Sequence, residues 1–217
     1  MKNIKAFIFD LDGVIVDTAK YHFLAWKELA NSLGFDFNVM DNELLKGVSR
    51  VRSLEILLEI GKKDFNEQIK IELASRKNNH YVGLISKMTA TEILPGVTDF
   101  LQSTKDAGLK IVLGSASKNA PLILEKIGLK HYFDALIDGN KVNKAKPDPE
   151  VFLKGARAVK VKNSQCVVFE DAVAGIEAAK NAGMIAIGVG DPQTLKSADT
   201  VISGFYGLTV SKLLKLV

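Results

Sequence analysis

An apolar run near the N-terminus leads directly into two carboxylates in residues 6–14, which read AFIFDLDGV. The run from Ala6 to Phe9 is short and ends at an acidic residue, which is typical of a buried parallel strand. Asp10 and Asp12 lie two residues apart, and in extended backbone this spacing points both side chains to the same side. We therefore expect the chain to leave its first strand through an acidic loop.

Three more apolar runs have the same form, and helical patterns lie between them. The expected strands are Ile111 to Leu113, Val167 to Phe169 and Ile185 to Val189, and the expected helices are Pro121 to Ile127, Pro149 to Val159 and Ala172 to Ala182. Strands that alternate with helices predict an α/β fold with a doubly wound, Rossmann-like parallel sheet. Sites in such folds lie at the carboxyl ends of the strands.

The segment from residue 17 to residue 88 breaks this alternation, because it contains helical patterns and no convincing strand. Its expected helices are Tyr21 to Leu33, Asp41 to Leu45, Val51 to Ile60 and Asn66 to Ile85. The segment is inserted immediately after the first strand. We therefore predict an α-helical cap domain of residues 17–88 on a core of residues 1–16 and 89–217.

The composition limits the classes of protein to consider. The 217 residues are 47% hydrophobic, which allows a substantial core, and the formal net charge of +4 is spread along the chain. No apolar run approaches the roughly 20 residues of a membrane span. A single cysteine, Cys166, cannot form an internal disulfide and fits a reducing compartment. We expect a cytoplasmic monomer that acts on a small anionic substrate and binds neither nucleic acid nor membrane.

The acidic loop allows three interpretations. Asp10 and Asp12 could share a divalent cation, for which hard oxygen ligands favour Mg²⁺. One carboxyl could instead stay protonated and act as an acid. Both residues could also simply shape a turn before Gly13. Phosphoryl transfer through a carboxylate uses the first two arrangements together, since it needs a charged nucleophile and a neighbouring proton donor.

Four segments in order resemble the signatures of the haloacid-dehalogenase-like superfamily: DLDGV at 10–14, Ser115, Lys146 and the pair Glu170-Asp171. Each follows a predicted strand or its loop, and their joint occurrence is more specific than any one alone. The resemblance implies that Asp10 is the nucleophile, Asp12 the general acid and base, Ser115 a donor to the phosphoryl oxygens and Lys146 a balancing cation. It also implies a magnesium site made by Asp10, Asp12, Glu170 and Asp171.

Further segments resemble the β-phosphoglucomutase family within that superfamily: DTAKYH at 17–22, LKGVSR at 45–50, RKN at 76–78 and SASKN at 115–119. This resemblance implies interconversion of β-D-glucose 1-phosphate and glucose 6-phosphate through an aspartyl phosphate and a bound bisphosphate. Thr18 and His22 would then couple cap closure to Asp12. The implied substrate-binding residues are Gly47, Val48, Ser49, Arg50, Lys77, Ala116, Ser117, Lys118 and Asn119. Arg50 suits a second phosphate clamp because its guanidinium offers a planar fork of donors.

Two other functions remain open at this point. A sugar-phosphate phosphatase of the same superfamily would share the core residues and use water as the final acceptor. A signalling receiver module also combines acidic residues, a hydroxyl and a lysine on an α/β sheet, although the helical insertion argues against it. One position departs from the family pattern, because Ala172 follows Glu170-Asp171 where relatives often have serine.

Overall fold

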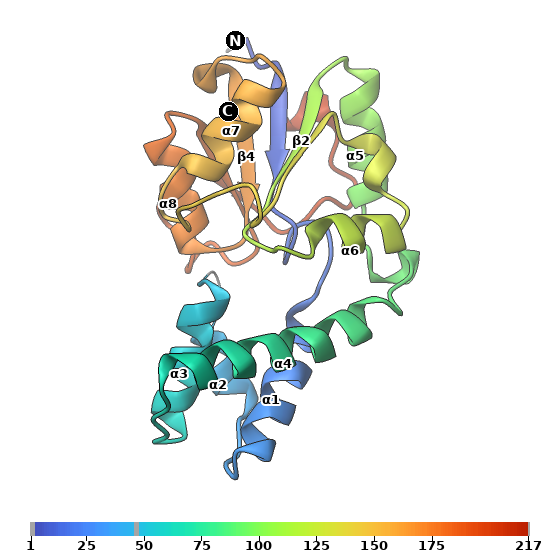
Figure 1. The fold of residues 1–217 in the computed structure, drawn as a ribbon. Coiled ribbons are helices and arrows are strands. Elements are labelled where there is room, and N and C mark those ends of the chain that lie inside the picture. Colours follow the sequence, from blue (N-terminus) through green and yellow to red (C-terminus); the bar gives the residue numbers. More distant parts are fainter. Residues whose placement is uncertain (1–2, 46–47, 217) are drawn as a thin grey trace. The chain divides into compact units, whose positions relative to one another are not determined.

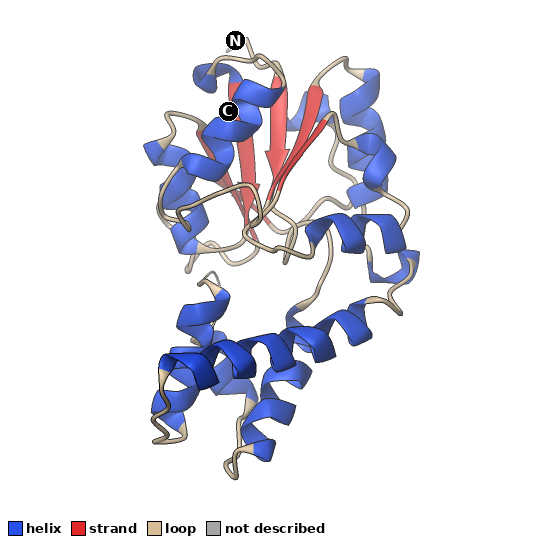
Figure 2. Cartoon of the chain, viewed as in Figure 1, coloured by secondary structure: helices blue, strands red, loops and turns tan. Residues whose placement is uncertain are grey.

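A computed structural model describes residues 3–45 and 48–216 (Figures 1 and 2). The chain divides into two compact units: residues up to Asp17 together with those from Thr89 onward, and the inserted segment Thr18–Met88. The first division falls after Asp17, one residue beyond the boundary expected from the sequence. Each unit has its own buried cluster of apolar side chains.

The first unit contains a six-stranded parallel sheet with the strand order β3-β2-β1-β4-β5-β6. The strands are β1 Ala6–Phe9, β2 Lys110–Gly114, β3 Ala135–Ile137, β4 Cys166–Glu170, β5 Ile185–Val189 and β6 Thr200–Ile202. The order reverses direction at β1, which confirms the doubly wound α/β fold. Ligands in such sheets bind at this switch point, beyond the carboxyl ends of the strands.

The side chains of β1 alternate between two buried layers, as the period of a strand requires. Ala6 and Ile8 pack in a cluster with residues of α7 and α8, while Phe7 and Phe9 face an aromatic cluster on the other side. In that cluster the rings of Phe9 and Phe169 stack with centroids 4.7 Å apart. Burying each such ring stabilises the fold by about 1.5–3 kcal/mol, so the central strands are held firmly from both faces.

Helices connect the strands of this unit. They are α5 Val97–Asp106, α6 Ala120–Lys126, α7 Glu150–Ala158, α8 Val173–Asn181 and α9 Val210–Leu213, with short 3₁₀ turns η1 Ala90–Glu92, η2 Lys130–Tyr132 and η3 Asn163–Gln165. The predicted helices at 121–127, 149–159 and 172–182 correspond to α6, α7 and α8. The sequence patterns predict neither the three-residue strands β3 and β6 nor the helices α5 and α9.

The inserted unit is entirely helical in the residues described. It contains α1 Ala19–Ser32, α2 Val39–Glu43, α3 Arg50–Ile60 and α4 Glu67–Ile85, close to the four predicted ranges. Helix α4 packs against α1 and α3 around an apolar cluster that includes Trp26, Leu57 and Leu73. No helix in the described part of the chain has the length and apolar character needed to cross a bilayer.

Candidate active site

The strand register brings the predicted core residues to one edge of the sheet. Phe9 pairs with Leu113 of β2 on one side and with Phe169 of β4 on the other. Asp10 therefore follows β1 at the level where β4 ends with Glu170, and Ser115 comes directly after the end of β2. Residues far apart in sequence meet here because parallel strands present their carboxyl ends at the same edge.

Asp10 is held in a fixed orientation by backbone and side-chain donors. The residue is 6% exposed, and its Oδ2 accepts a hydrogen bond of 3.0 Å from the backbone N–H of Asp12. Oδ1 accepts a hydrogen bond of 2.5 Å from the Nζ of Lys146. The turn that follows is closed by the N–H of Gly13, which donates to the carbonyl of Val16 over 2.8 Å. A buried carboxylate fixed in this way suits a nucleophile that must point at one phosphorus atom.

Lys146 lies between two buried carboxylates. Its ammonium also donates to Glu170 Oε1, and it lies 4.9 Å from the centre of the Phe152 ring. Burial alone would lower the pKa of Lys146, but Asp10 and Glu170 outweigh it and raise that pKa above its ordinary value. The lysine is therefore charged throughout the physiological range and opposes negative charge on Asp10.

The loop that carries Lys146 is held by a residue that the sequence patterns do not single out. Glu150 Oε2 accepts hydrogen bonds of 2.9 and 2.8 Å from the backbone N–H groups of Asn143 and Lys144. Its other oxygen pairs with Lys154 Nζ at 2.6 Å. The hydrogen bond from Lys154, followed by the one from Lys144, lowers the pKa of Glu150 to about 2. The only signal in the sequence is an acidic residue in the first turn of a helix, which is common at any helix start.

Glu170 and Asp171 have different surroundings. Glu170 Oε1 accepts a hydrogen bond from the Nζ of Lys146. Its Oε2 accepts a hydrogen bond of 3.0 Å from the N–H of Ala172 at the start of α8. Asp171 instead lies against Gly13: a Cβ on that glycine would be 2.1 Å from Asp171 Oδ2, and Gly13 has φ +75°. Only glycine fits this conformation and this space. The acidic loop after β1 is thus packed against the acidic pair after β4.

The negative charge of the carboxylates in this cluster is not balanced by the positive charge near them. Burial, followed by repulsion from Glu170, Asp10 and Asp12, raises the pKa of Asp171 to about 8. Within residues 3–45 and 48–216, no group of three or more His, Cys, Asp or Glu side chains is arranged closely enough to hold a metal ion. The donor chemistry nevertheless fits Mg²⁺, which binds through one or two carboxylates and completes its shell with other oxygens. Asp10, Glu170 and Asp171, with the carbonyl of Asp12, are the groups that would hold the ion, and both oxygens of Asp10 and of Glu170 also accept hydrogen bonds.

The loop after β2 contains the predicted phosphate-binding residues. Ser115 is buried, its N–H donates to the carbonyl of Ile137 over 2.9 Å, and its Oγ accepts 3.1 Å from the N–H of Ser117. Ser117 Oγ in turn accepts 3.3 Å from the N–H of Asn119. Ala116 and Lys118 are exposed. The loop is therefore a tight, hydrogen-bonded turn with exposed positions next to the end of the strand.

In the inserted unit, the partly exposed His22 pairs with the buried Lys77. Lys77 Nζ lies 2.9 Å from His22 Nδ1 and 4.5 Å from the centre of the Trp26 ring, and the ring of His22 stacks on Tyr81. Burial, with the positive charges of Lys77 and Arg50, lowers the pKa of His22 well below 6.5. His22 is therefore neutral at physiological pH. Thr18 is buried at the N-cap position of α1.

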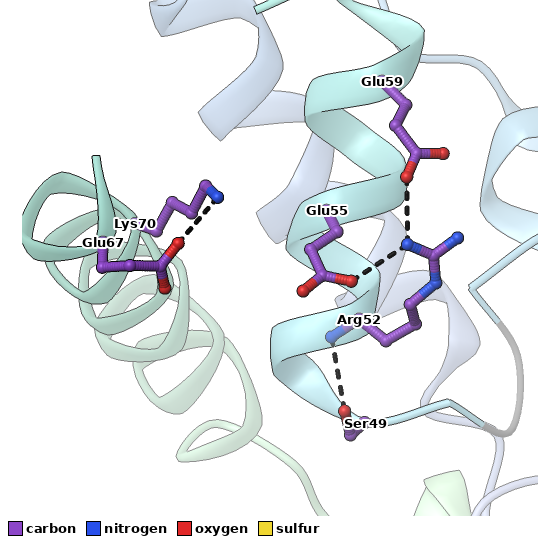
Figure 3. Close-up of polar contacts among 6 residues, drawn as sticks. All are labelled: Ser49, Arg52, Glu55, Glu59, Glu67 and Lys70. Atoms are coloured by element: carbon purple, nitrogen blue, oxygen red, sulfur yellow. Dashed lines mark hydrogen bonds and ion pairs between the residues drawn. The ribbon is translucent and has the colours of Figure 1, made fainter. Parts of the chain in front are cut away.

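The residues before and within α3 have distinct roles (Figure 3). Ser49 is the N-cap, and its Oγ accepts 3.3 Å from the N–H of Arg52. Arg52 pairs with Glu55 and Glu59 at 2.9 and 3.0 Å, while Lys70 pairs with Glu67 on α4. Arg50 makes no ion pair with any residue in the described ranges, and burial lowers its pKa. Arg50 rather than Arg52 is thus available for an anion.

The remaining predicted substrate residues are less defined. Val48 is exposed in the segment before α3. Gly47 lies outside the described residues.

Comparisons with known proteins agree with this geometry. Residues 4–183 match the haloacid dehalogenase-like hydrolase family. The chain is 45% identical to the β-phosphoglucomutase of Bacillus subtilis over 212 residues, which cover 97% of this chain and 94% of that protein. It is 34% identical to a fructose-1-phosphate phosphatase of Escherichia coli over 84% of this chain and 94% of that protein.

A solved structure extends the likeness to three dimensions. The crystal structure of β-phosphoglucomutase from Clostridium difficile matches with a TM-score of 0.93 and 44% identity, covering 98% of this chain and 96% of that one. The family match excludes a signalling receiver module. The chain belongs to the haloacid dehalogenase-like hydrolase family and, within it, to the β-phosphoglucomutases.

Proposed function

We propose that this chain is a β-phosphoglucomutase that interconverts β-D-glucose 1-phosphate and glucose 6-phosphate. The observation that carries the proposal is 45% identity to the Bacillus subtilis enzyme along 97% of the chain. The core geometry supports it, because Asp10 is buried and fixed between the N–H of Asp12 and the ammonium of Lys146. The phosphatase alternative rests on relatives of lower identity, such as the Escherichia coli phosphatase at 34%.

In the first half-reaction, a carboxylate oxygen of Asp10 attacks the phosphorus of a bound sugar phosphate. The bond from phosphorus to the sugar oxygen breaks, and Asp12 gives that oxygen a proton. Lys146 opposes the charge on Asp10 and on the transferring group. Ser115 and the N–H groups near it would orient the phosphoryl oxygens. The product is an aspartyl phosphate and a sugar hydroxyl.

In the other half-reaction, a sugar hydroxyl attacks the phosphorus of the aspartyl phosphate, and Asp12 takes the hydroxyl proton. The bond between phosphorus and the Asp10 oxygen breaks, which restores the free Asp10 carboxylate. A monophosphate that receives the group at its free position becomes the bisphosphate. If the bisphosphate then turns and returns its other phosphate to Asp10, the net result is movement of one phosphate between the two positions. One residue therefore serves as acid and base in turn, which requires a mobile proton on Asp12 rather than a permanent charge.

We propose that the enzyme uses Mg²⁺ held by Asp10, the carbonyl of Asp12, Asp171 and Glu170, the last of which is also bound to Lys146. The raised pKa of Asp171 supports this, because after burial its main causes are the neighbouring carboxylates Glu170, Asp10 and Asp12, whose negative charge a cation would relieve. When bound, the ion would balance the charge on the phosphoryl oxygens. Glu170 would also hold Lys146 in place.

The inserted unit would supply the rest of the substrate site. Arg50, together with Lys118 and Asn119, would clamp the phosphate that is not reacting, and Val48 and Ser49 would adjoin the sugar along with Gly47. Lys77 and His22 would act as one unit near the sugar, since their nitrogens lie 2.9 Å apart. A cap that covers the site would also protect the aspartyl phosphate from water.

The decisive test is incubation with β-glucose 1-phosphate, Mg²⁺ and a small amount of the bisphosphate as primer. We expect glucose 6-phosphate to exceed free phosphate many times over. Asp10→Asn should abolish both product formation and incorporation of phosphate into the protein while leaving the fold intact. Release of free phosphate as the main product would instead support the phosphatase alternative.

We further propose that the enzyme works in the cytoplasm as a monomer. Burial raises the pKa of the Cys166 thiol to about 11, so this lone cysteine is an inert core residue. Light scattering coupled to gel filtration tests the oligomeric state, and a mass near 23.6 kDa is expected.

A further inference from the structure

The turn after β3 is hydrogen-bonded to the loop after β2, which contains the predicted phosphate-binding residues. The side-chain amide of Asn140 donates a hydrogen bond of 2.9 Å to the carbonyl of Lys118. The N–H of Gly139 donates to the carbonyl of Ser117 over 3.3 Å. Two successive carbonyl oxygens of the loop are therefore bound by donors from a segment more than twenty residues away in sequence.

Hydrogen bonds within the turn hold Asn140 in place. Asp138 is buried, and its Oδ1 accepts 3.0 Å from the N–H of Asn140. Its Oδ2 lies 3.4 Å from the Asn140 amide nitrogen, so both groups of Asn140 are oriented by one carboxylate. Gly139 approaches so closely that a Cβ there would lie 2.2 Å from the carbonyl oxygen of Ala116. Any side chain at this position would displace the loop.

These contacts have an electrostatic consequence for anion binding. A phosphate is repelled by carbonyl oxygens and attracted by N–H groups. The turn engages the carbonyls of Ser117 and Lys118 and crowds that of Ala116, so these oxygens face the turn. The backbone N–H groups of Ala116 and Lys118 have no protein acceptor among residues 3–45 and 48–216. The loop thus has two of its carbonyl acceptors occupied and two N–H donors left for a ligand.

We propose that Asn140 and Gly139 are positioning residues that orient the loop from Ser115 to Asn119 for a phosphate. This inference rests on the proposed function and deepens it. Asn140 contacts Lys118 and therefore affects binding of the phosphate that lies away from Asp10. Gly139 contacts Ala116, next to Ser115, and therefore affects the position of the phosphoryl group that reacts. Neither residue touches the substrate.

The test of Asn140 compares Asn140→Ala and Asn140→Asp with the wild type. A neutral hydrogen bond is worth enough for about a fivefold change in binding, so KM for β-glucose 1-phosphate should rise about fivefold in Asn140→Ala. The value of kcat should change less than twofold, since the phosphate is held equally in ground and transition states. Asn140→Asp keeps the shape but loses the donor, and should be at least as impaired. Asn163→Ala, which removes a partly exposed amide elsewhere, is the control and should behave as wild type.

A second measurement separates the two positioning residues. Acetyl phosphate carries one phosphoryl group and no second phosphate. The rate at which it phosphorylates Asp10 should therefore be within twofold of wild type in Asn140→Ala. The same rate should fall severalfold in Gly139→Ala. If KM is unchanged in both Asn140 variants, or if Asn140→Asp matches wild type, the proposed role of Asn140 is wrong.

Failure of the proposed function would look different. If the wild type makes no glucose 6-phosphate, the mutase assignment fails, whatever Asn140 does. The positioning role can still be measured by titrating inorganic phosphate and following the amide resonances of Ala116 and Lys118. We expect these resonances to shift in the wild type, with about fivefold weaker binding in Asn140→Ala; equal affinities would overturn the inference.

Discussion

Lys146 shows how strongly a single side chain determines the state of this site. Its side chain is only 5% exposed, and it is the cation in direct contact with both Asp10 and Glu170. Without it, two buried carboxylates would face each other with no counter-charge. Breaking a buried pair by removing one partner is costly because the other charge stays buried.

Lys146→Met should therefore reduce both activity and stability. We expect kcat/KM to fall by at least about 10² and the free energy of unfolding at pH 7.5 to fall by about 3 kcal/mol. The loss should be smaller at pH 5.5. Carboxyl groups whose pKa is raised in the folded state destabilise it at high pH, and this cost disappears as the pH falls and they take up protons.

Urea unfolding of Lys146→Met at the two pH values gives the measurement. Lys126→Met is a suitable control, because Lys126 is exposed on α6 and its loss should change stability by less than about 0.5 kcal/mol. An equal loss of stability at pH 5.5 and 7.5 would contradict the explanation by carboxylate repulsion.

Among the secondary-structure elements, α8 begins without the side chain that usually caps a helix. Its N-cap position is Ala172 in extended backbone, with φ −116° and ψ 142°, and no side-chain hydrogen bond caps the first turn. Glu170 accepts a hydrogen bond from the N–H of Ala172 itself, which precedes the first turn, so this bond does not cap the N–H groups of that turn.

Ala172→Ser should stabilise the protein by about 0.5–1 kcal/mol, because serine can accept a hydrogen bond from an N–H of the first turn. For a chain of this size, the melting temperature would rise by about 2–4 °C per kcal/mol. Thermal unfolding followed by circular dichroism checks this. Ala172→Val adds bulk without an acceptor, and a similar gain in that variant would show that capping is not the cause.

His22, at the junction of α1 and α4, predicts that stability depends on pH. Since the pKa of His22 is lowered in the folded state, the unfolded chain binds a proton at a higher pH than the folded one. Stability is therefore fully present above pH 6.5 and decreases as the pH falls below it. The slope from this one group reaches at most about 1.4 kcal/mol per pH unit.

His22→Gln can still accept from Lys77 but cannot titrate. Its free energy of unfolding should fall less steeply than that of the wild type between pH 6.5 and 5, measured by urea denaturation. The same substitution at the exposed His131 serves as a control. A parallel slope in wild type and His22→Gln would show that another group causes the acid sensitivity.

The elements also show which features a sequence can reveal. The strands β1, β4 and β5 are continuously buried, so their apolar runs are distinctive, and their carboxyl ends place Asp10 and Glu170 at one edge. The strands β3 and β6 have three residues each, lie at the sheet edges and are only partly buried, so no run marks them. The contacts of Asn140 with Lys118 depend on how two loops meet, which no local pattern encodes.

For the molecule as a whole, the unbalanced carboxylates of the active site lower the free energy of unfolding. Asp10, Glu170 and Asp171 are gathered at one edge of the sheet, with Lys146 bound to two of them. Burial, followed by this excess of negative charge, raises the pKa of Asp171 to about 8. A ligand that binds the folded state alone stabilises it in proportion to its concentration and affinity. The proposed Mg²⁺ site should therefore affect global stability.

Binding of Mg²⁺ must displace the proton from Asp171 at pH values below about 8. The apparent affinity for Mg²⁺ should therefore rise by up to about tenfold per unit between pH 6.5 and 7.5 and level off above pH 8. Accordingly, 5 mM Mg²⁺ should raise the melting temperature of the substrate-free protein more at pH 8.5 than at pH 6.5, and calorimetry should detect proton release at pH 7. Asp171→Asn should remove both effects, because its amide carries neither the charge nor the proton. An affinity that is the same at pH 6.5 and 8.5 would mean that Asp171 is not a ligand, and the metal would then have to be held by Asp10 and its neighbours alone.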